Sequence, residues 1–205
     1  MLCLGFDTSD APLVAGLYDL RAHQLLEVKT WFLGRALASQ LHPCLNEFMG
    51  SYAWGEIGAI AVGCGPGSFT GTRLGVVTAR VLAQQLEVPL LGLSSLGTIA
   101  WHYRYELREQ DGVVSRRAQQ GHQYLGIYRY QGGSLNSVWG DRLLADSEAE
   151  ALLASWLYPY RPLAPPPPRD YGCALLTWAA HRWHDTLRAG KEFPHWSSVV
   201  PLYGK

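Results

Sequence analysis

The sequence lacks a net charge, a long hydrophobic run and paired cysteines. Seventeen lysines and arginines balance seventeen aspartates and glutamates, so the chain as a whole carries no electrostatic signature of nucleic-acid binding. No stretch of about twenty residues is uniformly apolar, so we expect no transmembrane helix and no membrane contact. The first ten residues, MLCLGFDTSD, lack a basic segment before a long apolar run and predict a strand rather than a signal peptide. These absences favour a cytoplasmic location.

The four cysteines, Cys3, Cys44, Cys64 and Cys173, stand apart in the sequence. None belongs to a C-x-x-C pair, so the spacing of a structural zinc site is missing and we expect no metal. Their mostly apolar neighbours predict buried free thiols in a reducing compartment. Hydrophobic residues make up 48% of the 205-residue chain, enough for the core of one large domain or two small ones.

Apolar periodicity predicts the order β-β-β-α-β-α-β-α in the first half, opening with an antiparallel meander. The expected strands are 2–6, 12–18, 24–32, 56–63, 88–93, 113–115, 123–130 and 136–144. The expected helices are 38–49, 68–86, 95–107, 147–157 and 174–188. Ser39 and either Ser94 or Ser95 are predicted helix N-caps.

A cluster of glycines follows the apolar strand 56–63 and precedes the helix 68–86. Glycines before a helix N-terminus can cradle a phosphate, or they can let two backbones pack closely. Gly71 is followed by Thr72-Arg73, so the Lys-Ser/Thr pair of a Walker A loop is missing. The acidic residue of a dinucleotide fingerprint is missing as well. The spacing therefore favours close packing over phosphate binding.

Small residues recur at four-residue steps along the same helix, at Gly71, Gly75, Ala79 and Ala83. Residues i and i+4 share one helix face, and each glycine costs the helix about 1 kcal/mol relative to alanine. This small-residue stripe lies either on the chain's own sheet or against another subunit. Bulky residues on the adjoining faces make the helix apolar nearly all round, so we expect a partner to cover it.

The segment GCGPGSFTGTRLGVVTARVLAQQLEVPLLGLSSL, residues 63–96, closely resembles the signature of the TsaB (YeaZ) family. That family is the dimerisation subunit of the bacterial tRNA threonylcarbamoyladenosine synthesis machinery. Leu4–Ser9 resembles its opening strand and turn, Ser39-Gln40-Leu41 its first helix, and Pro201-Leu202-Tyr203 its closing motif. The resemblance is strong over roughly the first hundred residues and weak afterwards.

The resemblance implies the α/β fold of the actin, sugar-kinase and Hsp70 ATPase (ASKHA) superfamily. We accordingly expect a ribonuclease H-like βββαβα lobe over 1–107. A reduced second lobe is expected over 108–205, with a proline-rich loop at 162–168.

The family's role implies a scaffold without catalytic residues, which binds and activates a TsaD-like catalytic subunit. A TsaE-like ATPase is the further protein partner, and tRNA is reached only through the complex. A homodimer through the same helices is a second arrangement. No cofactor of its own is implied, although ATP or ADP can act at the level of the complex.

The resemblance also implies which residues meet the partner, because the first two helices of the family pack against the same helices of the other subunit. The implied interface is Gly71, Leu74, Gly75, Thr78, Ala79, Leu82, Ala83, Leu41, Leu45 and Phe48. The H-x-x-x-H metal pair of the catalytic relative corresponds by position to Ser95 and Ile99, which cannot replace imidazole ligands. No metal ligand and no catalytic residue are therefore assigned.

An alternative function is a nucleotide-binding ATPase of the same fold that uses Asp7, Thr8 and Ser9 with the glycine loop. These three residues occupy the place where active superfamily members hold phosphates and metal. They also suit a simple Asx-turn between two strands, which we favour. A protease role has no support, since the sequence shows neither a nucleophile–base arrangement nor a metal pair.

Overall fold

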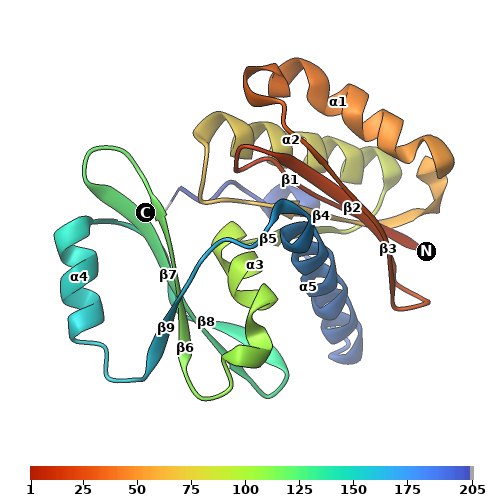
Figure 1. Ribbon diagram of the computed structural model, residues 1–205. Helices are drawn as coiled ribbons and strands as arrows, with labels where there is room; N and C mark the ends of the chain where they lie inside the picture. The colour runs from red at the N-terminus through yellow and green to blue at the C-terminus, as the bar shows by residue number, and fades with distance from the viewer. Residues whose placement is uncertain (204–205) are drawn as a thin grey trace.

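The computed structural model describes residues 1–203 as two β-sheets separated by helices (Figure 1). Gly204 and Lys205, the end of the second predicted lobe, lie outside the described residues. The elements of the first half are β1 (Leu2–Asp7), β2 (Leu13–Asp19), β3 (Gln24–Trp31), α1 (Leu37–Phe48), β4 (Ile57–Gly63), α2 (Phe69–Leu86), β5 (Leu90–Leu93) and α3 (Ser95–His102). Those of the second half are β6 (Asp111–Arg117), β7 (His122–Gln131), β8 (Ser134–Ala145), α4 (Asp146–Ala154), β9 (Tyr160–Leu163) and α5 (Pro168–Arg188).

The two sheets share the order of four strands, and the first sheet has a fifth, β5, at its edge. The first is β3-β2-β1-β4-β5 and the second is β8-β7-β6-β9. In each, three antiparallel strands form a meander and the next strand joins its first strand in parallel, β4 on β1 and β9 on β6. The predicted meander and the predicted α/β fold are confirmed, and the second half repeats the topology of the first.

The helices and sheets form alternating layers (Figure 1). α1 and α2 cover one face of the first sheet, and α5 covers its other face. α3 packs between α5 and the second sheet, whose outer face carries α4. Within residues 1–203, no helix combines the length and the apolar character needed to cross a membrane.

The predicted helix boundaries hold best where a serine caps the helix. Ser68 caps α2 and Ser94 caps α3, each accepting a backbone N–H three residues ahead, as expected of an N-cap. The prediction for Ser39 is wrong, because α1 already begins at Leu37 and the Ser39 hydroxyl donates back to the Ala36 carbonyl. α3 ends at His102, five residues before its predicted end.

The C-terminal part of the chain returns to the first sheet. α5 packs on β1, β2 and β3, and the tail contacts α2, where Arg73 Nε donates to Tyr203 Oη at 2.7 Å. The predicted loop 162–168 starts inside β9 and ends at Pro168, the first residue of α5. The division at residues 107/108 stays a prediction; it falls where the chain leaves the first sheet for the second.

The small-residue stripe of α2 faces the interior of the chain, which corrects the expectation that a partner covers it. Ala79 and Ala83 are fully buried in the core beneath the first sheet. Gly71 and Gly75 lie against Thr8, and a Cβ atom on either glycine would run into that residue. The missing bulk therefore lets the Asp7–Ser9 turn approach α2.

The remaining predicted interface residues divide between the interior and the surface. Thr78, Leu41, Leu45 and Phe48 are buried, like the four stripe residues, so these eight cannot form a contact surface. Leu74 and Leu82 are half-buried. The large apolar residues that α2 exposes are instead Phe69, at its first position, and Val77 and Val81 further along, with exposed fractions of 57%, 56% and 52%.

All four cysteines, each within the described residues, are free thiols. Cys3, Cys44 and Cys64 are buried as predicted, whereas Cys173 is half-buried. Burial raises the pKa of the Cys3 and Cys64 thiols to about 12. These two side chains therefore stay protonated and act as small apolar core residues.

The contact between α2 and the Asp7–Ser9 turn predicts that Gly71→Ala lowers the free energy of unfolding by about 1–3 kcal/mol. The new methyl group would meet the Thr8 carbonyl oxygen, a backbone atom that cannot rotate away. This clash should outweigh the roughly 1 kcal/mol of helix propensity gained by alanine. Urea unfolding measures the difference. Gly50→Ala is the control, because nothing lies within 4 Å of its Cβ position; equal stability of the two variants would contradict the prediction.

Candidate functional site

The candidate site lies where the parallel strands β1 and β4 end. β1 ends at Asp7 and β4 at Gly63, so the Asp7–Ser9 turn meets the glycine loop at the carboxyl edge of the sheet. This edge is where open α/β sheets usually bind ligands. Asp7, Thr8 and Ser9 are all buried, with exposed fractions of 3% or less.

Both carboxylate oxygens of Asp7 accept hydrogen bonds from the chain itself. Oδ1 accepts the Ser9 N–H at 2.6 Å, which is the predicted Asx-turn. Oδ2 accepts the Ser95 hydroxyl at 2.8 Å and the Tyr171 hydroxyl at 2.5 Å. Burial, then the charge of Asp7, raises the pKa of Tyr171 well above its ordinary value, so the phenol stays protonated and donates.

The glycine loop packs against this turn and uses its donors there. The Ser68 N–H donates to the Ser9 carbonyl at 2.7 Å, and the Gly71 and Thr72 N–H groups donate to Ser68. Thr8 Oγ1 in turn donates to the Gly71 carbonyl at 2.7 Å. Three N–H groups at this end of α2, those of Ser68, Gly71 and Thr72, are therefore engaged inside the chain.

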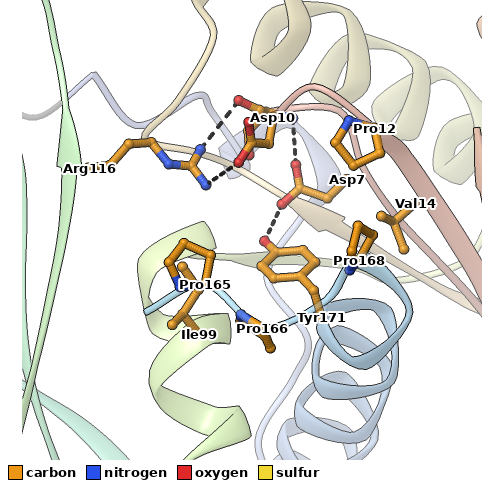
Figure 2. Close-up of a pocket in the computed structure, with 11 residues that line it drawn as sticks. Asp7, Asp10, Pro12, Val14, Ile99, Arg116, Pro165, Pro166, Pro168 and Tyr171 are labelled. Atoms are coloured by element: carbon orange, nitrogen blue, oxygen red, sulfur yellow. Dashed lines mark hydrogen bonds and ion pairs between the residues drawn. The ribbon is translucent and has the colours of Figure 1, made fainter. Parts of the chain in front are cut away.

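Arg116 of β6 ties the second sheet to the same turn. Its guanidinium donates to the Pro66 carbonyl at 3.1 Å, to the Ser9 carbonyl at 3.4 Å and to Asp10 Oδ2 at 3.1 Å. Figure 2 shows Arg116 directed at Asp10 and Tyr171 directed at Asp7 around a cavity of about 230 Å³. The rest of the lining is mainly apolar: Pro12, Val14, Ile99, Pro165, Pro166 and Pro168.

A second cluster of one serine, one tyrosine and one aspartate lies beside the first. Its serine is Ser94, the N-cap of α3, which directly precedes Ser95. Ser94 and Tyr128 both donate to the Asp141 carboxylate. Burial raises the pKa of Asp141, while the hydrogen bonds from Ser94 and Tyr128 act in the opposite direction. Ser94 and Ser95 thus connect α3 to an aspartate and a tyrosine on each side, Asp141 with Tyr128 and Asp7 with Tyr171.

The residues around Asp7 do not fit a magnesium–nucleotide group. Oδ2 of Asp7 already accepts two hydrogen bonds, from Ser95 and Tyr171, and Oδ1 accepts one, from Ser9, which fills three of the about four acceptor sites of a carboxylate. The described residues 1–203 contain no group of three or more His, Cys, Asp or Glu side chains able to hold a metal ion. The geometry suits a structural tie between α3, α5 and the first sheet rather than phosphate chemistry.

The sequence predicts only part of this site. The structure brings Asp7, Thr8 and Ser9 together with the glycine loop, as the motif predicts. It also adds Tyr171, which is 164 positions from Asp7 in the chain, and Arg116, 106 positions from Asp10. Of the distant residues that contact Asp7, the sequence singles out only Ser95, because it stands in the place of a metal-binding histidine of the catalytic relative.

Comparisons with known protein sequences agree with the resemblance to the TsaB (YeaZ) family. Residues 32–159 match the family model described as TsaD: tRNA N6-adenosine threonylcarbamoyltransferase. A Bacillus subtilis (strain 168) protein, tRNA threonylcarbamoyladenosine biosynthesis protein TsaB, is 32% identical over 161 residues, covering 77% of this chain and 65% of its own length. The TsaB protein of Escherichia coli K12 is 51% identical over 45 residues, 22% of this chain and 20% of its own length. The match thus spans less than two thirds of the length of the B. subtilis relative, 65%, and a fifth of the length of the E. coli relative.

A solved structure gives the same picture at the level of the fold. YeaZ from Pseudomonas aeruginosa superposes with a TM-score of 0.76 and 21% identity, over 99% of this chain and 100% of that one. Together with the family model, this match confirms the predicted ASKHA-type fold.

The half-buried Asp141 carboxyl predicts a pH-dependent contribution to stability. Because its pKa is raised in the folded chain, the native state holds this proton to higher pH than the unfolded state. Its contribution is therefore fully present below the ordinary carboxyl pKa of about 3.9 and is lost as pH rises through the folded pKa. The stability of the wild type relative to Asp141→Asn should therefore fall as the pH rises above about 4, measured by urea unfolding.

The control for this prediction is Glu150→Gln, at an exposed carboxyl of α4. Its unfolding free energy should follow that of the wild type in parallel over the same pH range. A parallel course for Asp141→Asn as well would show that the Asp141 carboxyl does not titrate differently in the two states.

Proposed function

The chain belongs to the TsaB (YeaZ) family, and on that premise we propose that it is a non-catalytic subunit in tRNA threonylcarbamoyladenosine biosynthesis. In this role it binds and activates a TsaD-like catalytic subunit. A TsaE-like ATPase completes the complex, and tRNA modification takes place at the complex in the cytoplasm. ATP or ADP acts at the level of the complex, and the chain holds no cofactor of its own.

The observation that carries this proposal is the filled site at Asp7. A carboxylate that accepts three hydrogen bonds, from Ser9, Ser95 and Tyr171, has most of its acceptor capacity used within the chain. The hydroxyls of Ser9 and Ser95 lie 2.9 Å apart, and within residues 1–203 their recorded partners include no histidine or lysine that could act as a base. Because the fold around this site is intact, the site supports a role in which the chain binds a partner protein through its surface.

The surface best suited to the catalytic partner is the outer face of α1 and α2. Val77 and Val81 lie one turn apart on α2 and expose more than half of their side-chain surface. Leu74 and Leu82 border them and are half-buried. α1 packs beside α2 and is linked to it by a contact of 3.3 Å between His42 Nε2 and Thr78 Oγ1. The same face offers a homodimer contact, since a twofold interface uses one patch twice.

The proposed surface predicts that the double substitution Val77→Asp with Val81→Asp weakens association with the TsaD-like subunit by about tenfold or more. Burying two unpaired carboxylates in an apolar contact costs more than the roughly 1.4 kcal/mol that corresponds to a tenfold change. Both positions are exposed in the free chain, so the fold should persist. Size-exclusion chromatography with light scattering measures the association, and circular dichroism verifies the fold.

The matched control is Leu157→Asp, at a side chain with an exposed fraction of 98% between α4 and β9. This variant should associate as the wild type does. If the wild type fails to associate, the scaffold proposal fails. If both variants associate normally, the contact lies elsewhere on the chain.

The alternative of a nucleotide-hydrolysing enzyme predicts tight binding of Mg·ATP by the isolated chain and loss of that binding in Asp7→Ala. We expect isothermal titration calorimetry to show no Mg·ATP binding that depends on Asp7, because the Asp7 oxygens already accept three hydrogen bonds within the chain. Asp10→Ala is the companion variant, since Asp10 borders the same cavity but is exposed. Binding that depends on Asp7 and not on Asp10 would favour the enzyme over the scaffold.

A further inference from the structure

A second cavity lies at the far end of α5 from Asp7. Tyr171, in the first turn of α5, reaches Asp7, whereas His181, His184 and Arg188, in its last turns, line a pocket of about 300 Å³. Seventeen residues separate Tyr171 from Arg188, about 25 Å along a helix. The pocket also receives side chains from β2, the segment after α3 and β7, so both halves of the chain build it. Its volume is at the lower end of the usual range for small-ligand sites.

Aromatic rings form much of its wall. Trp101 is buried, with its indole N–H donating to Thr177 Oγ1 at 3.1 Å. Tyr130 meets the Trp101 ring edge-on at 6.2 Å between centroids, and Tyr105 meets the Tyr130 ring edge-on at 5.9 Å. Tyr105 exposes 59% of its surface. A fixed buried indole beside an exposed phenol ring is suited to a planar group that stacks.

Cationic groups stand beside these rings. The Arg104 guanidinium lies 4.5 Å over the Trp101 ring and 4.2 Å over the Tyr105 ring. Within residues 1–203 the Arg104 guanidinium donates one hydrogen bond, to the Trp101 carbonyl at 2.9 Å. Most of its five N–H groups are therefore left for a ligand. Arg188 also lines the pocket and exposes 73% of its side chain.

The charged side chains around the pocket favour binding of an anion through contacts with individual groups rather than through a strong electrostatic field. No aspartate or glutamate lines the pocket in the described part of the chain, but Asp185 lies close by and contacts both His181 and Arg188. His184 stacks on His23 with 4.2 Å between ring centroids. Burial, then His23, lowers the pKa of His184, so this ring is neutral near pH 7. Arg104 and Arg188 are the cationic donors that remain for an anion, and Arg188 also donates to Asp185 Oδ1 at 3.3 Å.

We propose that this pocket binds a nucleotide unit, with the base stacked on the exposed Tyr105 ring beside Tyr130 and the phosphate held by Arg104 and Arg188. Bases stack on aromatic side chains at about 1–3 kcal/mol each, and guanidinium groups match phosphate oxygens. The unit is either a free nucleotide or part of a single-stranded RNA. The RNA source rests on the proposed function in tRNA modification, whereas the free nucleotide does not.

The test uses the full chain and three probes: AMP, adenosine and a fluorescein-labelled single-stranded RNA of about twelve nucleotides. Calorimetry measures the first two, and fluorescence anisotropy measures the RNA. AMP should bind more tightly than adenosine, because the arginines contact only the phosphate. Tighter binding of RNA than of AMP identifies the RNA as the source, and the reverse order identifies a free nucleotide. The dependence of Kd on salt should be weak, corresponding to about one phosphate contact.

Two variants and two matched controls locate the site. Tyr105→Ala and Arg188→Gln should each raise Kd by about fivefold or more, whereas Tyr105→Phe, which keeps the ring, should bind normally. Tyr158→Ala is the control for Tyr105, since Tyr158 exposes 57% of its surface and lies 4.0 Å from the Arg129 guanidinium outside the pocket. Arg35→Gln, at an exposed arginine before α1, is the control for Arg188.

The outcomes separate this proposal from the scaffold proposal. Saturable binding lost in Tyr105→Ala and kept in Tyr158→Ala supports the pocket. No saturable binding of AMP or RNA overturns it, as does an equal loss in variants and controls or equal affinity for AMP and adenosine. Association with the TsaD-like subunit is measured in parallel on the wild type and Tyr105→Ala. Normal association without nucleotide binding refutes the pocket alone, and nucleotide binding without association refutes the scaffold alone.

Discussion

The buried carboxylate of Asp7 is the constraint on which the arrangement of both halves depends. An ionised carboxylate removed from water is strongly unfavourable unless its oxygens accept hydrogen bonds. The chain supplies those bonds from its own turn, from the first residue of α3 and from the first turn of α5. Each donor fixes one element relative to the end of β1. The position of α5 on the first sheet, far from the strand that precedes it, follows from the same contacts and from the apolar layer below them.

The close approach of α2 to the Asp7–Ser9 turn explains the glycines of the signature. Gly71 and Gly75 admit Thr8, whose hydroxyl then bonds the Gly71 carbonyl. The sequence alone shows that one face of α2 lacks bulk, but an internal sheet and an external subunit both fit that pattern. Burial decides between them, because Ala79 and Ala83 are enclosed by the core of the same chain. The apolar residues left for a partner lie on the opposite side, at Val77 and Val81.

Whether a feature can be predicted depends on how far apart in the sequence its interacting residues lie. The three-strand meander and the helix after the glycine loop were predictable, since periodicity and caps are local signals. The repeat of one strand order in two sheets was not, because topology can recur without recurrence of residue identities. Within the site, Asp7 to Ser9 form a local turn that a motif reveals. Tyr171, Arg116 and Asp141 reach their partners through packing of distant segments, and single tyrosines or arginines give no signal of such pairing.

The two aspartate groups on consecutive residues of α3 also limit how the halves can move. Ser95 faces Asp7 and Tyr171, whereas Ser94 faces Asp141 and Tyr128 of the second sheet. A rotation of one sheet relative to the other would pull a serine hydroxyl from a buried carboxyl group, and each lost bond to a charged group costs about 1–3 kcal/mol or more. Arg116 adds bonds from the second sheet to the turn and the glycine loop. We therefore expect the halves to move as one body, so that the chain acts on a partner by presenting a fixed surface rather than by closing around a ligand.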